Sequence, residues 1–221
     1  MPDGGKPIVD PARHCRHGSP MTFASQISRQ PRPYDPSAGA DILDRFEGQD
    51  AATFLAAVAA CAPYLKGLML REEGFLRASL AMDPAAVLDP EFAALEGLTT
   101  DTLASGLRQA KRRVALWSAL CDLGGIWPLE QVTGALTRLA DRAVDVTLQR
   151  LVADEIRRGK LPGAVAADAV TAGGMVALAM GKMGAGELNY SSDIDLICLF
   201  DETRYKGVEH EARASFIRVT L

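Results

Sequence analysis

The chain has 221 residues, of which 48% are hydrophobic and only 6% aromatic, and its formal net charge is −4. This length allows one or two domains with a sizeable core, which Ala, Leu and Val must supply. The acidic balance argues against a protein that holds nucleic acid by bulk charge, because neutralising phosphates requires a surplus of Lys and Arg. A small local phosphate site is still compatible with it.

The cysteines and the apolar runs indicate in which cellular compartment the protein is expected. Cys15, Cys61, Cys121 and Cys198 have spacings that match no metal knuckle or redox motif, and the last three lie in apolar patterns where a free cysteine packs as a small hydrophobe. No charged-then-apolar leader opens the chain, and no apolar run reaches membrane-spanning length. We therefore expect a cytoplasmic protein with no membrane partner.

Residues 1–37 are rich in Pro, Gly, Ser and Arg and show no apolar periodicity, which predicts a disordered leader. Within it, the stretch HCRH at 14–17 lacks a second ligand pair and is interpreted as solvated polar sequence rather than a metal site. Met21 is an alternative start of the protein.

Residues 38–160 are expected to form a helical region. Apolar residues recur at helical spacing from 41 onward, and two longer helices are predicted at 99–122 and 128–159. Thr100 or Asp101 is the expected N-cap of the first, and Pro128 and Gly159 bound the second. The basic residues Arg108, Lys111, Arg112 and Arg113 favour a solvated helix face, with a patch for an acidic partner or a nucleotide phosphate as the alternative.

The composition changes in residues 161–221. Two short apolar runs, 173–180 and 194–200, are bounded by Gly and polar residues, as is typical of buried strands, and residues 209–221 resemble the first turns of an amphipathic helix. These elements predict an α+β fold in which a helical bundle precedes a small sheet. Because two strands make a marginal sheet, we expect the chain to end inside a domain.

The segment GKMGAGELNYSSDIDLICLF at 181–200 carries the chemistry. Asp193 and Asp195 are spaced so that both side chains can reach one face of a strand, about 6.6 Å apart along the backbone. Like charges at this spacing repel, and a divalent cation removes the penalty: Mg²⁺ accepts one or two carboxylates together with water and substrate phosphates. The sequence therefore predicts a metal site that supports phosphoryl or nucleotidyl transfer.

The glycine-rich turn before the two aspartates suits the same substrate. Gly181, Gly184 and Gly186 let backbone N–H groups approach a phosphate, and Lys182 adds a positive charge. A hydroxyl from Ser191 or Ser192 completes the predicted phosphate-binding set. The order of residues matches neither a Walker A loop nor a dinucleotide-binding loop. Taken singly, the glycines indicate a tight turn and the aspartates a solvated strand end.

This segment closely resembles the signature of the glutamine synthetase adenylyltransferase/adenylyl-removase family, large bifunctional bacterial enzymes of nitrogen regulation. The stretch RRVALWSALCDLGGIWPLEQVTGALTRLADRAVD resembles the helical block that precedes the signature in that family. The likeness covers about residues 40–221. It implies a polymerase-β-like nucleotidyltransferase domain with a small mixed sheet.

The resemblance also implies roles for individual residues. Gly181 and Lys182 match the turn, Ser192 precedes the acidic pair, and Asp193 and Asp195 match the catalytic metal ligands for Mg²⁺. The family pattern has a third carboxylate on a later strand. Asp201 lies roughly 20 Å beyond Asp195 along an extended strand, too far to share a metal. We expect the third ligand beyond Leu221 and interpret the chain as an incomplete nucleotidyltransferase domain.

Family members carry two such domains, and the motif alone does not distinguish them. The stretch APYLKGLMLREEGFL resembles the opening helices of the family, and the motif follows the leader, which favours the N-terminal half. That half removes AMP from the adenylylated tyrosine of glutamine synthetase by phosphorolysis, giving ADP. The partners that the resemblance implies are glutamine synthetase, ATP or ADP with phosphate, and a PII-type signal protein.

Three alternatives stay open. The chain could belong to the half that attaches AMP from ATP to glutamine synthetase. It could be another nucleotidyltransferase, although the acidic charge balance counts against RNA as its substrate. It could also be a non-catalytic helical scaffold.

Overall fold

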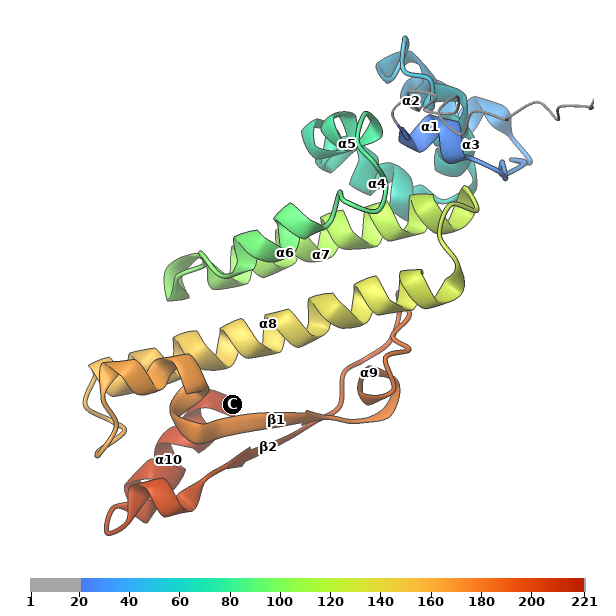
Figure 1. Cartoon of the computed structure of the whole chain (residues 1–221). Coiled ribbons are helices and arrows are strands. Elements are labelled where there is room, and N and C mark those ends of the chain that lie inside the picture. The colour runs from blue at the N-terminus through green and yellow to red at the C-terminus, as the bar shows by residue number, and fades with distance from the viewer. Residues whose placement is uncertain (1–20, 221) are drawn as a thin grey trace, which may run out of the picture.

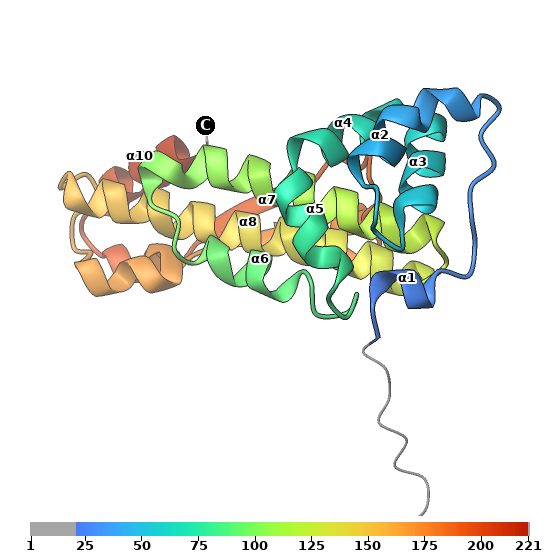
Figure 2. The ribbon, with the colours of Figure 1, turned by 90° about the horizontal axis from the view of Figure 1, so that it is seen from above.

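The computed structural model describes residues 21–220, which form two long helices with shorter helices on one side and a β-hairpin on the other (Figure 1). α7 (Thr100–Leu123) and α8 (Leu129–Arg157) run antiparallel and lie side by side in both views (Figure 2). They confirm the two long helices predicted from the sequence. Within residues 21–220, no helix combines the length and the apolar character that crossing a membrane requires.

The ends of α7 follow from the residues that flank it. Thr99 forms a capping box with Thr102, whose hydroxyl accepts the Thr99 backbone N–H at 2.9 Å. The predicted N-cap, Thr100 or Asp101, is therefore one or two residues too late. Gly124 follows the helix, and Gly125 adopts a positive φ of 65°, which favours glycine and ends the helix.

Shorter helical segments precede α7 and cover one side of it. They are α1 (Phe23–Gln26), η1 (Pro36–Gly39), α2 (Ala40–Arg45), α3 (Ala52–Cys61), α4 (Pro63–Arg71), α5 (Glu73–Leu80) and α6 (Asp89–Leu95). Pro63 occupies the first position of α4, where its fixed φ suits the helix. Pro84 lies in the turn between α5 and α6.

Residues 21–37 differ from the predicted disordered leader. Phe23 of α1 is fully buried, with its ring centroid 5.1 Å from that of Trp117 and 5.7 Å from that of Phe54. The backbone N–H of Ser28 donates a hydrogen bond to the Gly124 carbonyl at 2.8 Å. A single aromatic residue in a Pro- and Arg-rich stretch has no periodicity that could announce its burial. The HCRH stretch, at 14–17, lies outside the described residues.

The remaining elements follow α8. They are η2 (Ala166–Gly174), β1 (Met175–Ala179), α9 (Gly181–Gly184), β2 (Leu196–Phe200), η3 (Glu202–Tyr205) and α10 (Glu209–Thr220). β1 and β2 pair antiparallel, with Met175 opposite Phe200 and Ala179 opposite Leu196. The predicted α+β class, both predicted strands and the amphipathic helix are confirmed. The burial predicted for the strands is wrong for β2, whose residues are all at least partly exposed, because the described residues pack against one face of the pair. The sheet of the described residues consists of this single pair.

The hairpin has two unlike faces. Its inward residues, among them Met175, Ala179 and Phe200, pack against the rest of the protein. Its other face alternates with these positions and carries four apolar side chains that are each about half exposed: Val176, Leu178, Ile197 and Leu199. This face continues at one end toward Asp195.

Buried apolar side chains form two clusters. The larger joins the N-terminal helices, α7 and the first part of α8, and it also includes Met183 and Leu188 from the segment between the strands. The smaller joins the last part of α8 to β1, η3 and α10, and Val144 contacts both clusters. The predicted division at residue 160 stays a prediction.

α10 is held on α8 by a buried carboxylate. The Glu155 side chain accepts hydrogen bonds from the Ser215 hydroxyl at 2.8 Å and from Arg218 Nη2 at 2.6 Å. Phe216 of α10 stacks on Phe200 of β2, with ring centroids 4.6 Å apart. These contacts fix α10 relative to the end of β2.

The cysteines match the prediction only in part. Cys121 is fully buried in α7, and burial raises the pKa of its thiol. Cys61 and Cys198 are exposed, although their apolar surroundings in the sequence predicted packed side chains. Cys61 is the last residue of α3, and Cys198 lies in β2, in which no residue is fully buried.

Candidate functional site

The turn after β1 requires glycine at two positions. Gly181 has a φ of 56°, which a side chain would disfavour. Gly184 lies so close to the Ala179 carbonyl oxygen that a β-carbon would clash with it. These two residues let the chain turn directly from the end of β1 into the four-residue helix α9.

The backbone of this turn is largely satisfied by its own hydrogen bonds. The N–H groups of Gly184 and Glu187 donate to the carbonyls of Met180 and Lys182, at 3.2 and 2.8 Å. Gly186, with a φ of 75°, likewise donates to the Met183 carbonyl at 3.1 Å. The N–H groups of Gly184 and Gly186 therefore hold the turn, and a role for these glycines in binding phosphate stays a prediction. The Lys182 side chain is exposed.

Residues 189–192 form a compact polar turn built on one amide side chain. The Asn189 carbonyl oxygen Oδ1 accepts hydrogen bonds from the Ser191 N–H at 3.1 Å and from the Ser192 hydroxyl at 2.8 Å. The Ser192 hydroxyl also accepts the Asn189 N–H at 3.1 Å. An Asn followed by serines two and three positions later is a signal for such a turn. A role for Ser191 and Ser192 in phosphate binding stays a prediction.

The two aspartates lie directly before β2, and both are exposed. The Met180 N–H donates to the Asp195 carbonyl at 2.9 Å, which extends the pairing of the strands by one residue. Because alternate residues of a strand share a face, Asp195 lies on the same face as Ile197. A β-carbon placed on Gly181 would be 3.7 Å from Asp195 Oδ2. The structure thus brings the Asp195 carboxylate beside the first glycine of the turn.

The carboxylates of Asp193 and Asp195 suit a cation that prefers oxygen ligands and keeps some of its bound water. In residues 21–220, no group of three or more His, Cys, Asp or Glu side chains is arranged to hold a metal ion. Mg²⁺ needs only one or two carboxylates from the protein and takes water and phosphate oxygens as further ligands. Asp193 and Asp195 are therefore compatible with Mg²⁺, and their role as its ligands stays a prediction.

Asp201 has a different structural task. Its carboxylate accepts hydrogen bonds from the Thr203 hydroxyl at 2.6 Å and the Thr203 N–H at 3.0 Å, and so caps η3. These bonds lower the pKa of the Asp201 carboxyl. This agrees with the exclusion of Asp201 as a third metal ligand.

The basic residues of α7 serve mainly to join helices. Glu72, at the junction of α4 and α5, is buried and accepts hydrogen bonds from Arg112 at 2.5 Å and Arg113 at 3.0 Å. Arg113 also contacts Glu91 of α6 at 3.0 Å. The solvated face predicted for this cluster is therefore limited to Arg108 and Lys111, which are exposed. The acidic partner of Arg112 and Arg113 belongs to the same chain.

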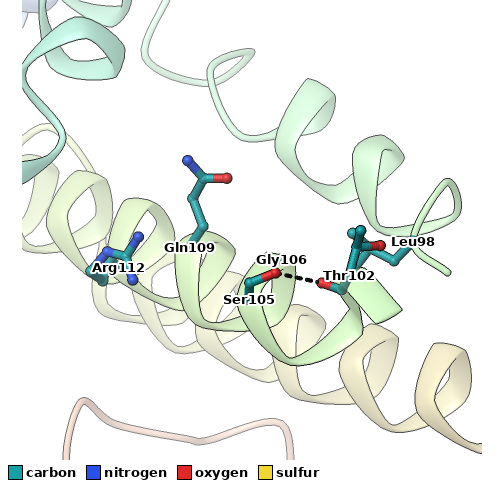
Figure 3. Close-up of a pocket in the computed structure, with 6 residues that line it drawn as sticks. All are labelled: Leu98, Thr102, Ser105, Gly106, Gln109 and Arg112. Carbon is teal, nitrogen blue, oxygen red and sulfur yellow. Dashed lines mark hydrogen bonds between the residues drawn. The ribbon is translucent and has the colours of Figure 1, made fainter. Parts of the chain in front are cut away.

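A groove of about 390 Å³ lies on α7 beside the connection from α6 (Figure 3). It is lined by Leu98, Thr102, Ser105, Gly106, Gln109 and Arg112. The Ser105 hydroxyl donates to the Thr102 carbonyl at 2.9 Å, and Arg112 is engaged by Glu72. No residue of the 181–195 segment lines this groove, so it is separate from the candidate site.

Comparison with known proteins shows which family the chain belongs to. The model of the family described as "Glutamate-ammonia ligase adenylyltransferase" matches residues 51–220, which include both long helices and the whole hairpin. The chain belongs to this family. No solved structure matches it.

Several curated relatives of the glutamate-ammonia ligase adenylyltransferase family are similar to the chain. A protein from Bradyrhizobium sp. (strain ORS 278) is 40% identical over 84% of this chain, and one from Caulobacter vibrioides is 41% identical over 75%. A third, from Rhodopseudomonas palustris (strain TIE-1), is 36% identical over 90%. Each is named bifunctional glutamine synthetase adenylyltransferase/adenylyl-removing enzyme. The matches cover 20%, 17% and 22% of these relatives, so the chain spans about a fifth of their length.

Proposed function

We propose that the chain is the N-terminal, adenylyl-removing part of a bifunctional glutamine synthetase adenylyltransferase/adenylyl-removing enzyme, and that it acts in nitrogen regulation. The observation that carries the proposal is the contact between the turn and the carboxylate. Met180 is hydrogen-bonded to Asp195, and Gly181 lies beside the Asp195 side chain. A substrate phosphate at the turn would then be next to the acidic pair, as nucleotidyl transfer requires.

The choice of half rests on the helices before the motif. The stretch at 62–76 resembles the opening helices of the family. It forms the residue before α4, α4 itself and the first half of α5. Glu72 of this stretch is bonded to α7, which in turn packs along α8. The helices thus form one packed unit with the motif segment, and we propose that they position the protein substrate.

Asp193 and Asp195 would hold Mg²⁺ against the adenylyl phosphate. When bound, the metal supplies charge that offsets the negative charge of the reacting phosphate groups. An oxygen of inorganic phosphate would attack the adenylyl phosphorus as the bond from phosphorus to the tyrosyl oxygen breaks. The tyrosyl oxygen would take up the proton that the hydrogen phosphate loses, which gives ADP and the unmodified tyrosine side chain of glutamine synthetase. The exposed Lys182 ammonium would attract the phosphate groups. Asn189 holds Ser192 in place next to Asp193.

The direct test uses the full-length protein with adenylylated glutamine synthetase and phosphate. We expect ADP to form and the adenylylated tyrosine to lose AMP, as measured by mass spectrometry of the tyrosine-containing peptide. In the full-length protein, Asp195→Asn should abolish removal of AMP and keep its transfer from ATP. Loss of transfer with removal intact in that variant would assign the chain to the other half. Inactivity in both directions together with transfer to another acceptor would identify a different nucleotidyltransferase.

A thermal-shift measurement separates enzyme from scaffold. A ligand that binds the native state raises its apparent stability. We expect Mg²⁺ together with ADP to raise the melting temperature of the full-length protein, and this rise to be smaller in Asp195→Asn, which leaves the second nucleotidyltransferase domain unchanged. If this part of the protein is a scaffold with no nucleotide site, Asp195→Asn would leave the rise unchanged. A cytoplasmic location and regulation by a PII-type signal protein are parts of the same proposal.

A further inference from the structure

A buried hydroxyl group joins α8 to the segment that leads to the two aspartates. The backbone N–H of Leu188 donates to Thr137 Oγ1 at 3.3 Å, and both residues are buried. The same hydroxyl donates to the Thr133 carbonyl at 2.9 Å. Within the described part of the chain, this is the one hydrogen bond between α8 and residues 185–192.

The two bonds of Thr137 depend on each other. A hydroxyl group has a single proton, and donation to the Thr133 carbonyl leaves its lone pairs for the Leu188 N–H. A buried N–H group needs an acceptor, since no water replaces one. Thr137 therefore fixes where the chain crosses α8, while the Leu188 side chain occupies the larger hydrophobic cluster.

A short hydrogen-bonded turn connects Leu188 to the two aspartates. Asn189 follows directly and holds Ser191 and Ser192 through its side chain. Ser192 immediately precedes Asp193. At the other end, Asp195 is fixed by the Met180 N–H. The chain between Leu188 and Asp195 is thus held at both ends, and Thr137 supplies the hydrogen bond at one of them.

We propose that Thr137 is a positioning residue for Asp193, acting through the Leu188 backbone and the Asn189–Ser192 turn. The expected effect of Thr137 on kcat rests on the proposed adenylyl-removing function. The expected effect on the Leu188 backbone does not. Thr137 touches neither substrate nor metal in this proposal. It holds the turn from which the chain runs through Ser192 to Asp193.

The test compares Thr137→Val, which keeps the shape and removes the hydroxyl, with Thr137→Ser, which keeps the hydroxyl. Thr133→Val is the matched control, because among residues 21–220 the Thr133 hydroxyl bonds only to the Glu130 carbonyl of its own helix, at 3.4 Å. In full-length protein, exchange of the Leu188 amide hydrogen is measured together with kcat and KM for AMP removal. If Thr137→Val does not fold, Thr137→Ala replaces it.

We expect Thr137→Val to speed exchange of the Leu188 amide about tenfold and to lower kcat about tenfold, with little change in KM. Thr137→Ser restores both, and Thr133→Val changes neither. Unchanged exchange at Leu188 in Thr137→Val would overturn the proposal, as would an equal loss of kcat in Thr137→Ser. If the wild-type protein removes no AMP, the proposed function fails, and the exchange data alone still decide whether Thr137 holds the turn.

Discussion

Gly184 of α9 lies with its α-carbon against the carbonyl oxygen of Ala179, the last residue of β1, and the space between them cannot hold a β-carbon. This contact lets the chain leave the strand and begin the motif turn within a few residues. The neighbouring atoms are backbone, which cannot rotate away as a side chain can. The identity of residue 184 is therefore fixed by geometry as well as by any role in binding.

Gly184→Ala is expected to lower the free energy of unfolding by about 1–3 kcal/mol, because the strand and the turn must separate to admit the methyl group. Gly134→Ala is the matched control, since Gly134 is an exposed residue of α8 with no atom near its β-position. That change should raise the free energy of unfolding by roughly 0.5–1 kcal/mol through helix propensity. Denaturant unfolding measures both, and effects of the same sign would contradict the clash.

Asp193→Asn and Asp195→Asn are each expected to lower the rate of AMP removal at least about a hundredfold, because the metal loses a charged ligand. Both residues are exposed, so the melting temperature should change little. Asp201→Asn is the control, since an amide oxygen can still accept the bonds from Thr203. Undiminished activity in either of the first two variants, or its loss in the third, would refute the assignment of ligands.

Arg218→Leu is expected to lower the free energy of unfolding by about 1–3 kcal/mol, because it removes the charged partner of the buried Glu155 carboxylate. Arg213→Leu on the same helix serves as the comparison. Arg213 pairs with Glu202 at 2.9 Å, but both side chains are exposed, and such pairs contribute about 0–1 kcal/mol. Thermal unfolding should rank the two variants in this order; the reverse ranking would count against the α10 anchor.

Acid is expected to weaken the contact of α7 with the preceding helices. Burial alone would raise the pKa of Glu72, but the hydrogen bonds from Arg112 and Arg113 outweigh it and hold the pKa below its ordinary value of 4.5. A carboxyl group with a lowered pKa in the folded state stabilises the protein above its unfolded-state pKa, and this contribution is lost as the pH falls through the folded-state pKa.

The free energy of unfolding should therefore decrease as the pH falls below about 4.5, and Glu72→Gln should make that decrease less steep. Urea unfolding at a series of acidic pH values measures the slope. Glu47→Gln, at an exposed position, is the control that should leave the slope unchanged. An identical slope in Glu72→Gln and the wild-type protein would contradict the role of this carboxylate.

Much of the fold was predictable because its signals are local. The long helices carry apolar periodicity and are bounded by Gly125 and Pro128, although the N-cap of α7 is Thr99 and not the predicted Thr100 or Asp101. The strands are short apolar runs between polar turns. The Asp193 and Asp195 pair was visible for the same reason, since its spacing lies within three residues. The structure confirms the α+β class, and the metal and phosphate roles stay predictions.

Other parts depend on partners that are distant in the chain. Glu72 meets Arg112 across 40 residues, and Thr137 meets Leu188 across 51. No periodicity or composition within a sequence window links such residues. Phe23 was missed because its burial depends on a pocket formed by Phe54 and Trp117. The buried side chains that support the candidate site, such as Thr137, could therefore not be predicted from the sequence. The exposed residues of the site, such as Asp193 and Asp195, could be.

Met183 and Leu188 are buried in the same cluster as the N-terminal helices. The signature segment therefore cannot be moved to another protein without the helices that cover these two side chains. Grafted onto another hairpin, it would keep its glycines and aspartates but present two large apolar side chains to water. A substitution in the part of α8 that packs against the signature segment should therefore be accompanied by a compensating substitution in that segment as the protein diverges.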